Sequence, residues 1–413
     1  MVHTKVDVAG GIANIDADAW NSLAGSSAPF LKHAFLLAAE SSGCVSAATG
    51  WSPRHLTLAD GRGCLRAAMP LYEKTHSWGE FVFDWAWASA YHRAGVPYYP
   101  KLVSAAPFTP ASSRRLLLAD EDDTEAASLL VKAALQLAKN TGCSSLHVQF
   151  PNGRELDVLR AAGLKLRKDC QFHWHNRQYR SFDEFLSTFS SAKRKKARRD
   201  RRRVREQGIE FRWLKGDQTN PELWKEVCAL ISSTFLMRGS MPYYDYNFFT
   251  TLARTLPEDI LVIPAELDGT IVAAAVFYEG ADTLYGRYWG SNADYNALHF
   301  ETCYYQGIDY CIEKGLATFE PGTQGEHKIS RGFVPVDTWS AHWLAQPNFF
   351  SAVGQYLEEE QRHVDEYMSA LGQHSPYRDT SGDDDQGSSA AGDRFRGASS
   401  GTGQRQASPK PLR

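Results

Sequence analysis

The stretch 319–333, which reads FEPGTQGEHKISRGF, concentrates groups that could do chemistry. Glu320, His327, Lys328 and Arg331 are set among three glycines. Glycine lets a backbone turn tightly or approach a ligand closely, and residues three apart, such as Lys328 and Arg331, share a face of a helical turn. The stretch therefore predicts one wall of a ligand-binding cleft. The alternative is a surface turn whose charges are solvated.

A second wall is predicted from the helix expected over 298–314, whose first turn carries His299 and Glu301. A helix N-terminus favours anions, so this turn could bind a phosphate or an ionised carboxylate, with His299 as a base at neutral pH. The two side chains fit poorly as metal ligands, because positions two apart on a helix diverge by roughly 200°.

A third wall is predicted from the aromatic segment 76–101, where charged side chains are set among rings. These residues are Glu80, Asp84, Trp87 and Lys101. Either they line a cleft, or the rings form ordinary apolar core.

A basic helix is expected over 193–205, where ten of thirteen side chains are cationic and Asp200 is the one acid. Like charges three and four positions apart repel, so anions beside such a helix would stabilise it. We predict contact with phosphates of a nucleic acid, a nucleotide-bearing substrate or a phosphate-rich cofactor. The predicted anion-binding residues are Lys193, Arg194, Lys196 and Arg198. A solvated helix or a localisation signal is the alternative.

Cys170, His173 and His175 lie two or three positions apart on an expected strand, but two imidazoles and one thiol fall short of the usual zinc patterns. No metal site is predicted. The seven cysteines show no paired framework, which favours a reducing compartment. Without a signal-peptide pattern or a run of roughly 18 apolar residues, we expect a cytoplasmic protein with no membrane span, or an organelle interior if a transit peptide is missing.

The elements that must position these groups follow an α/β pattern. At 413 residues the chain exceeds what one core usually supports. Strands alternate with helices up to about residue 178, and the order of elements then restarts after the basic helix. We expect a first domain over 26–178 and a second over 179–372. Residues 1–25 are weakly patterned and are expected to be weakly ordered, and the polar tail 373–413 is expected to be disordered because it cannot bury enough apolar surface.

Several compositionally unusual strings carry a family resemblance. They are HSWGEFVFDWAW (76–87), YYPKL (98–102), PFTP (107–110), MRGS (237–240), HFE (299–301) and GEHKISRGF (325–333). Together they resemble the FemAB-like group of N-acyltransferases, which is related to GCN5-type acetyltransferases and to the Fem peptidoglycan aminoacyltransferases. The resemblance implies tandem acetyltransferase-like domains, each a mixed sheet flanked by helices, and transfer of an acyl or aminoacyl group to a small-molecule or peptide amine.

The donor is left open by one departure from the acetyltransferase pattern. A GxG/A turn that holds acyl-CoA would be expected near 290–298, where this chain reads GSNADYNAL and only Gly290 remains. We expect no permanently bound cofactor and acyl-CoA as co-substrate, held in another way. The alternative donor is an aminoacyl-tRNA, which would give the basic helix an RNA partner.

Amide formation needs a neutral amine, a polarised carbonyl and a route for the proton. We predict that Glu301 or His299 accepts the proton, with Glu320 and His327 as reserve candidates, while Lys328 and Arg331 stabilise the oxyanion or bind a phosphate or carboxylate of the acceptor. The residues predicted to bind substrate or cofactor are Arg331, His327, Glu320, Arg238, Glu80, Asp84, Trp87 and Lys101. Substrate-assisted transfer would need no enzyme base. The rival hypothesis is a non-catalytic scaffold that binds nucleic acid or another polyanion through 193–205.

Overall fold

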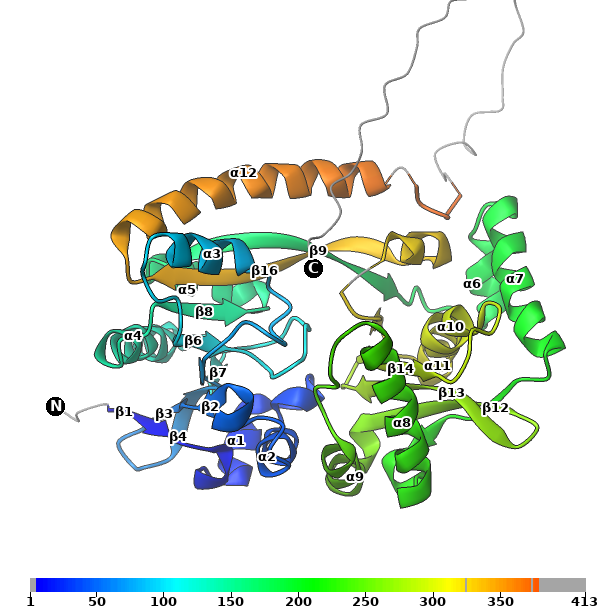
Figure 1. Ribbon diagram of the computed structural model, residues 1–413, viewed down its shortest axis with the longest axis horizontal. Coiled ribbons are helices and arrows are strands. Elements are labelled where there is room, and N and C mark those ends of the chain that lie inside the picture. The colour runs from blue at the N-terminus through cyan, green and yellow to red at the C-terminus, as the bar shows by residue number, and fades with distance from the viewer. Residues whose placement is uncertain (1–4, 324, 373, 379–413) are drawn as a thin grey trace, which may run out of the picture. The chain divides into compact units, whose positions relative to one another are not determined.

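The computed structural model contains two pairs of parallel strands, and in each pair the chain passes through helix between one strand and the other (Figure 1). The structure describes residues 5–323, 325–372 and 374–378, and those up to Tyr377 belong to one compact unit. The elements of the first half are β1 (Val6–Ala9), α1 (Ala17–Ala24), α2 (His33–Ser41), β2 (Trp51–Pro53), β3 (His55–Ala59), β4 (Leu65–Met69), β5 (Tyr72–Lys74), α3 (Trp85–Arg93), β6 (Lys101–Ser104), β7 (Leu117–Leu118), α4 (Thr124–Asn140), β8 (Ser145–Gln149), α5 (Leu156–Ala161) and β9 (Lys165–His175).

The second half begins with two helices and continues with a hairpin-rich sheet. Its elements are α6 (Phe182–Ser187), α7 (Ser191–Glu206), β10 (Glu210–Phe211), β11 (Leu214–Lys215), α8 (Pro221–Met237), α9 (Tyr246–Thr255), β12 (Ile260–Leu267), β13 (Thr270–Glu279), β14 (Thr283–Ser291), α10 (Leu298–Phe300), the π-helix η7 (Glu301–Tyr305), α11 (Gln306–Lys314), β15 (Thr318–Glu320), the 3-10 helix η8 (Glu326–Arg331), β16 (Val334–Leu344) and α12 (Pro347–Gly372).

In the first half, β6 and β8 pair in parallel and are joined by α4. Along β8 the side chains alternate: Leu146 and Val148 pack with α4 in an apolar core, while Ser145, His147 and Gln149 point to the other face. Both faces are buried, as is usual for parallel strands covered by helices. The polar face is therefore enclosed, and the charged residues of 76–101 lie there.

In the second half, β12, β13 and β14 form an antiparallel sheet. The turn between β12 and β13 is Asp268-Gly269, and both residues have positive φ, which is what a tight two-residue hairpin requires. Helices α8 and α9 cover one face of this sheet, and α6 and α11 cover the other. The parallel strand β15 then pairs with β14 after the chain has passed through α10, η7 and α11.

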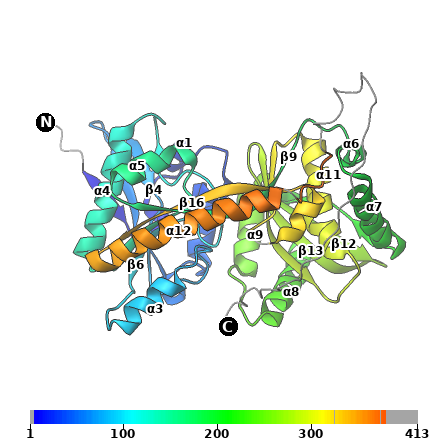
Figure 2. The same ribbon diagram turned by 90° about the horizontal axis from the view of Figure 1, so that it is seen from above.

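Two long strands join the halves. Strand β9 pairs with β16 along Lys165–His173 and with β15 at Trp174 and His175, while β16 also pairs with β8. The larger sheet is therefore continuous from β10 to β2. Helix α12 runs alongside β9 and β16 in both views (Figure 1; Figure 2) and is bound to β9 by the Arg167–Glu360 and Lys168–Asp365 ion pairs. The two-domain division of the sequence stays a prediction, and these strands cross its boundary.

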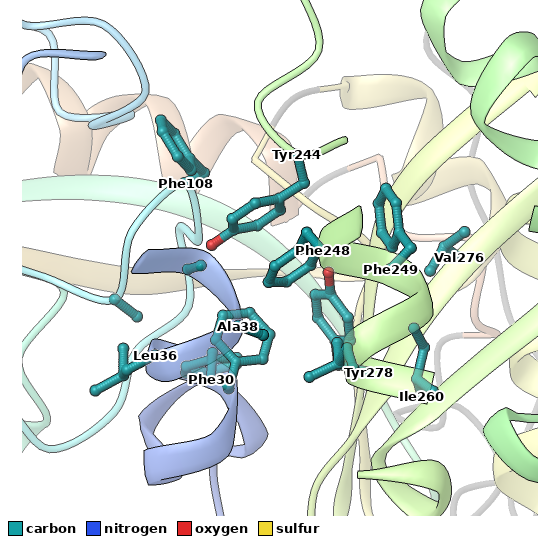
Figure 3. Close-up of a cluster of buried hydrophobic side chains, with 14 of the residues drawn as sticks. Phe30, Leu36, Ala38, Phe108, Tyr244, Phe248, Phe249, Ile260, Val276 and Tyr278 are labelled. Carbon is teal, nitrogen blue, oxygen red and sulfur yellow. The ribbon is translucent and has the colours of Figure 1, made fainter. Parts of the chain in front are cut away.

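A shared core also connects the halves. Figure 3 shows Phe30 of the N-terminal part beside Tyr278 of the second half, in the same buried cluster as Tyr244 and Phe248. The ring of Phe35 contacts those same three rings at centroid distances of 5.3 to 6.0 Å in edge-on geometry. Such pairs add to area burial, so this core resists separation of the halves.

The N-terminal segment differs from its prediction of weak order. Residues within 5–25 form β1, which pairs with β3, and α1, whose Trp20 is fully buried and donates a hydrogen bond to the Leu31 carbonyl at 2.8 Å. Asp16 caps α1 by accepting from the Ala19 amide. The short length of both elements hid their pattern in the sequence. The predicted disordered tail lies, from 379 to 413, outside the described residues.

Candidate functional site

The candidate site lies where β14 and β15 stop pairing. Their parallel register runs from Thr283↔Thr318 to Tyr285↔Glu320; β15 then ends, while β14 continues to Ser291. The backbone beyond this point has no neighbouring strand on that side among the described residues. Side chains of both strands and of the following stretch 319–333 are thereby brought together.

Glu320 and Arg287 form the buried centre of the site. The Glu320 Oε2 lies 3.7 Å from Nη2 of Arg287 and 3.9 Å from Nε2 of His173 on β9. All three of these atoms, and Nε of Arg287, are buried without a hydrogen-bond partner. Burial raises the pKa of Glu320 to about 7 and lowers that of His173 to about 3. Unpaired buried polar atoms are rare in native proteins, so the cluster is suited to a polar ligand.

The stretch 319–333 has the backbone that its glycines predicted. Gly322, Gly325 and Gly332 have φ of 98°, 118° and 96°, a region that side chains rarely adopt. A Cβ on Gly332 would also lie 2.6 Å from the ring of Phe185. Between these glycines η8 forms a 3-10 helix, in which residues three apart share a face.

Lys328 is the charged group of η8 that is least compensated. Its side chain is buried, and Nζ donates to the Gly322 carbonyl at 2.6 Å. Among the residues that the structure describes, no carboxylate lies within salt-bridge distance of it. Burial, reinforced by the nearby charge of Arg287, lowers the pKa of Lys328 to about 7. This ammonium can therefore gain or lose its proton near neutral pH.

Arg331, predicted to bind substrate, is held by the protein itself. Its guanidinium carbon lies 3.4 Å from the ring centroid of Phe300, and Nη2 is 3.5 Å from Asp200 of the basic helix α7. Nη1 donates to the His327 carbonyl at 2.7 Å. These contacts position η8 against α7 and leave the guanidinium little surface for a ligand.

The helix predicted over 298–314 is present, but its second turn is the π-helix η7. Glu301, predicted as proton acceptor, is buried; its Oε1 accepts from Gln306 at 2.8 Å and lies 3.1 Å from Nη2 of Arg201, while Oε2 has no partner. Burial raises the pKa of Glu301. His299 lies half-buried beside Trp289 and Tyr304, and burial lowers its pKa to about 4. Single-turn π-helices are frequent at functional sites.

Two further predicted residues lie at the rim of this group. His327 is exposed, and its Nε2 is 2.9 Å from the Tyr304 hydroxyl. Arg238 is exposed at the end of α8, close enough for its charge to lower the pKa of His299. A Cβ on Gly290 would lie 2.1 Å from the backbone of Leu230, so the lack of a side chain at this position lets α8 pack against β14.

The basic helix α7 buries one face and exposes the others. Ala197, Asp200 and Val204 are buried, and Arg201 pairs with Glu301 and with Asp309 at 2.6 Å. The predicted anion-binding residues lie on the remaining faces. Lys196 and Arg198 are exposed, Lys193 and Arg194 are half-buried, and only Arg198 has a carboxylate partner among the described residues, Asp183 at 2.9 Å.

The charged residues of 76–101 do not line an open cleft in this structure. Glu80, Asp84 and Lys101 are at most 3% exposed and form an ion cluster on the polar face of the first-half sheet. Lys101 Nζ donates to Asp84 at 2.5 Å, to Glu80 at 2.9 Å and to Ser77 at 2.8 Å. The ring of Trp87 packs edge-on against the ring of His342. The β8 and β16 side chains supply enough polar partners to bury these charges, which the sequence alone did not reveal.

The same loop nevertheless reaches the stretch 319–333 through its rings. Phe81 and Phe83 line a pocket of about 460 Å³ together with Thr323 and Glu326, residues of β9 and Tyr367 of α12. The predicted helix 298–314 is not part of this pocket. The loop is fixed to β9 because Arg167 donates to the Phe83 carbonyl at 2.8 Å.

Sequence reasoning missed Arg287 and misjudged His173 and Arg201. Arg287 was one cation in an otherwise apolar strand, a signal that could have marked it. His173 was weighed only as a metal ligand, and Arg201 was not separated from its basic neighbours, although it alone bridges two carboxylates. The sequence holds no signal for such a bridge, because Glu301 and Asp309 lie about a hundred positions away.

The arrangement of two joined halves can be compared with known proteins. The family described as FemAB-like, peptidoglycan biosynthesis/recognition, matches residues 11–379. The chain belongs to the FemAB-like family. The predicted resemblance is thereby confirmed, and family membership supports a transferase of the acyl or aminoacyl type.

Three solved structures share the fold of this FemAB-like protein. FemX is 13% identical, with a TM-score of 0.52, and the match covers 83% of this chain and 98% of FemX. The C-terminal domain of a putative lysylphosphatidylglycerol synthetase from Agrobacterium fabrum is 11% identical, with a TM-score of 0.53 and coverages of 84% and 97%. L-PGS from Bacillus licheniformis is 12% identical, with a TM-score of 0.50 and coverages of 83% and 96%.

These likenesses agree with the predicted fold class, an α/β protein with mixed sheets flanked by helices. No curated protein matches the chain significantly. Among the helices that the structure describes, none is both long and apolar enough to cross a bilayer. The described residues also contain no group of three or more side chains placed to hold a metal ion.

Proposed function

We propose that this FemAB-like protein transfers an acyl or aminoacyl group to an amine at the end of the β14–β15 pair. The observation that carries the proposal is Lys328, a buried lysine that is held by one carbonyl oxygen and, among the described residues, by no carboxylate. A cation in such a place is costly unless a negative charge appears beside it during the reaction. The tetrahedral intermediate of acyl transfer provides that charge.

Glu320 supplies the proton acceptor in this proposal. The ammonium of the acceptor passes one proton to the Glu320 carboxylate, and the free amine then attacks the donor carbonyl. The C–N bond forms, Lys328 stabilises the oxyanion, and the C–S or C–O bond of the donor breaks. The attacking nitrogen gives its second proton to the leaving thiolate or alkoxide, and Glu320 releases the first proton to water when the products leave, so charge and atoms balance. A pKa of about 7 suits Glu320 to this exchange at neutral pH.

The contacts favour Glu320 over Glu301 as the base. Oε1 of Glu301 is already bound by Gln306 and by Arg201 of the basic helix α7, and Arg201 also binds Asp309. Oε2 lacks a hydrogen-bond partner in both residues, but the nearest cation to Glu320 is Arg287 at 3.7 Å, whereas Arg201 lies 3.1 Å from Glu301. We assign Glu301 and Arg331 to positioning α7, η7 and η8, and His299 to the wall of the site.

The test compares two site variants with two matched controls. Lys328→Met and Glu320→Gln are compared with Lys132→Met and Glu313→Gln, which change exposed residues. Each is incubated with an amine panel and with acetyl-CoA, longer acyl-CoAs or aminoacyl-tRNA, and product is measured by mass spectrometry. We expect each site variant to lose about 100-fold in kcat/KM, the scale of a lost oxyanion contact, while thermal unfolding and the controls stay unchanged. Full activity in both site variants overturns the proposal.

A binding role for α7 is the second candidate, because Lys193 and Lys196 have no carboxylate partner among the described residues. If the protein binds RNA with steep salt dependence and turns over no donor, the scaffold hypothesis replaces the transferase.

A further inference from the structure

We infer that the pocket between Phe81, Glu326 and β9 binds a cationic group of the amine acceptor, so that the acceptor carries a second ammonium besides the reacting amine. The inference rests on the proposed function only in identifying the ligand as the amine acceptor. The pocket's preference for organic cations follows from its own walls. The ligand class is therefore an extended molecule with two amines, such as a polyamine or a basic peptide segment.

The lining of the pocket is aromatic and acidic. Its rings are Phe81, Phe83, Phe150, Phe172 and Tyr367, and its carboxylates are Asp169 and Glu326. No lysine, arginine or histidine lines it. Ring faces attract ammonium groups, and carboxylates add an ion pair, so every charged or quadrupolar element of the wall favours a cation and disfavours an anion. At about 460 Å³ the pocket has the size of a small-molecule site.

The two carboxylates are not neutralised by the protein. In the described part of the chain neither Asp169 nor Glu326 has a cationic partner. Glu326 accepts a hydrogen bond from the Tyr367 hydroxyl at 2.9 Å, and Asp169 accepts one from the Cys170 amide at 2.7 Å. The nearest cations of β9 are engaged elsewhere, since Arg167 binds Glu360 and Lys168 binds Asp365. The pocket wall therefore carries two carboxylates that form no ion pair among the described residues, while burial raises the pKa of Asp169 against the opposing charge of Arg167.

The pocket is connected to the reaction centre by strand β9. Asp169, Gln171 and His173 lie on one face of the strand, because side chains two apart point the same way. His173 is the residue next to Glu320, at 3.9 Å. Four residues of strand span about 13 Å, which sets the scale for the separation of the two amines. Glu326 likewise lies two positions before Lys328 in η8.

The experiment measures binding without a donor, so it does not depend on turnover. Spermidine and a neutral polyether of similar length are titrated into the full chain and into Asp169→Asn/Glu326→Gln by calorimetry. A control, Asp122→Asn/Glu313→Gln, changes the net charge equally at exposed sites. Phe83→Leu, at an exposed ring, keeps apolar bulk but removes the π face.

We expect spermidine to bind the wild type and the control alike, at least tenfold more weakly to the double variant, and several-fold more weakly to Phe83→Leu. No variant should bind the polyether more tightly than the wild type does. Equal spermidine affinity in the double variant and the control overturns the inference, as does equal affinity of wild type for polyether and spermidine. If binding follows the expectation but Lys328→Met and Glu320→Gln retain turnover, the proposed function fails while the cation pocket stands.

Discussion

Replacing Lys101 by methionine should be among the most destabilising single changes in this protein. Lys101 is fully buried and is the cation that neutralises both Glu80 and Asp84. Methionine fills a similar volume without the charge, so packing is largely retained. The two carboxylates would then be buried beside one remaining cation, Lys74, which is 3.9 Å from Glu80.

The magnitude follows from the titration of Asp84. The charge of Lys101 and the surrounding hydrogen bonds overcome the effect of burial and lower the pKa of Asp84 to about 2, against about 3.9 in an unfolded chain. At about 1.4 kcal/mol per pKa unit, this corresponds to roughly 2–3 kcal/mol of stabilisation above pH 4. Glu80 adds to the loss, which brings the expected cost to about 3–5 kcal/mol, as for other broken buried ion pairs.

The pH dependence identifies the cause. In the wild type the Asp84 contribution is present above its unfolded pKa and is lost as pH falls toward about 2. Without Lys101, burial raises the pKa values of both carboxyls, so they destabilise the variant at neutral pH and stop doing so when they are protonated. The difference between wild type and Lys101→Met should therefore shrink from pH 8 to pH 5.

Urea denaturation followed by tryptophan fluorescence measures this difference at each pH. Lys132→Met serves as the exposed control and should change stability by no more than about 0.5 kcal/mol. The triple variant Lys101→Met/Glu80→Gln/Asp84→Asn should recover at least half of the loss. A loss below about 1 kcal/mol, or one that does not vary with pH, refutes the charge argument.

Four other outcomes are expected. Gly290→Ala should lower stability by about 2–3 kcal/mol through the clash with Leu230, whereas Gly142→Ala, where nothing lies within 4 Å, should cost about 1 kcal/mol; thermal unfolding compares them. Arg201→Met should destabilise by about 2–3 kcal/mol because Glu301 and Asp309 lose their cation, while Arg203→Met should be neutral in the same assay. If Glu320 acts ionised and Lys328 protonated, kcat/KM should rise and then fall with a maximum near pH 7, and Lys328→Arg should move the alkaline limb upward. If the donor is a tRNA, removing the charges of Lys193, Arg194, Lys196 and Arg198 should reduce the slope of log K against log salt by about 3, measured by filter binding.

Local pattern was enough for much of the fold. The Asp268-Gly269 hairpin, the helix at 125–140 and the capping of α6 by Ser181, which accepts from the Glu184 amide at 3.1 Å, were all predictable because each depends on neighbouring residues. The pairing of β9 with β15 of the second half, and of β16 with β8 of the first half, was not predictable. Strand pairing over more than a hundred residues leaves no signature in either strand alone.

In the candidate site, too, some features were predictable from the sequence and others were not. The glycine-rich backbone of 319–333 was predictable, because positive φ is a property of single residues. Whether a charge there meets a partner was not predictable, because the partner comes from another element. Arg331 meets Asp200 of α7, while Lys328 meets only a carbonyl. Two cations three positions apart thus have different roles, and only their tertiary neighbours distinguish them.

Three lysines are buried at or beside the large sheet, Lys74, Lys101 and Lys328, and Lys101 and Lys328 differ most in how their charge is compensated. Both are excluded from water, but Lys101 is bound by two carboxylates and a hydroxyl, and its pKa is raised. Lys328 lacks a carboxylate, and its pKa falls to about 7. A fully paired cation has no further attraction for an oxyanion and needs a large change in structure to bind one. An under-compensated cation gains stability when an anion arrives. Lys74 of the first half still has the Glu80 carboxylate at 3.9 Å, whereas Lys328 has no carboxylate within salt-bridge distance among the described residues, so Lys328 is the buried lysine best prepared to stabilise a transition state.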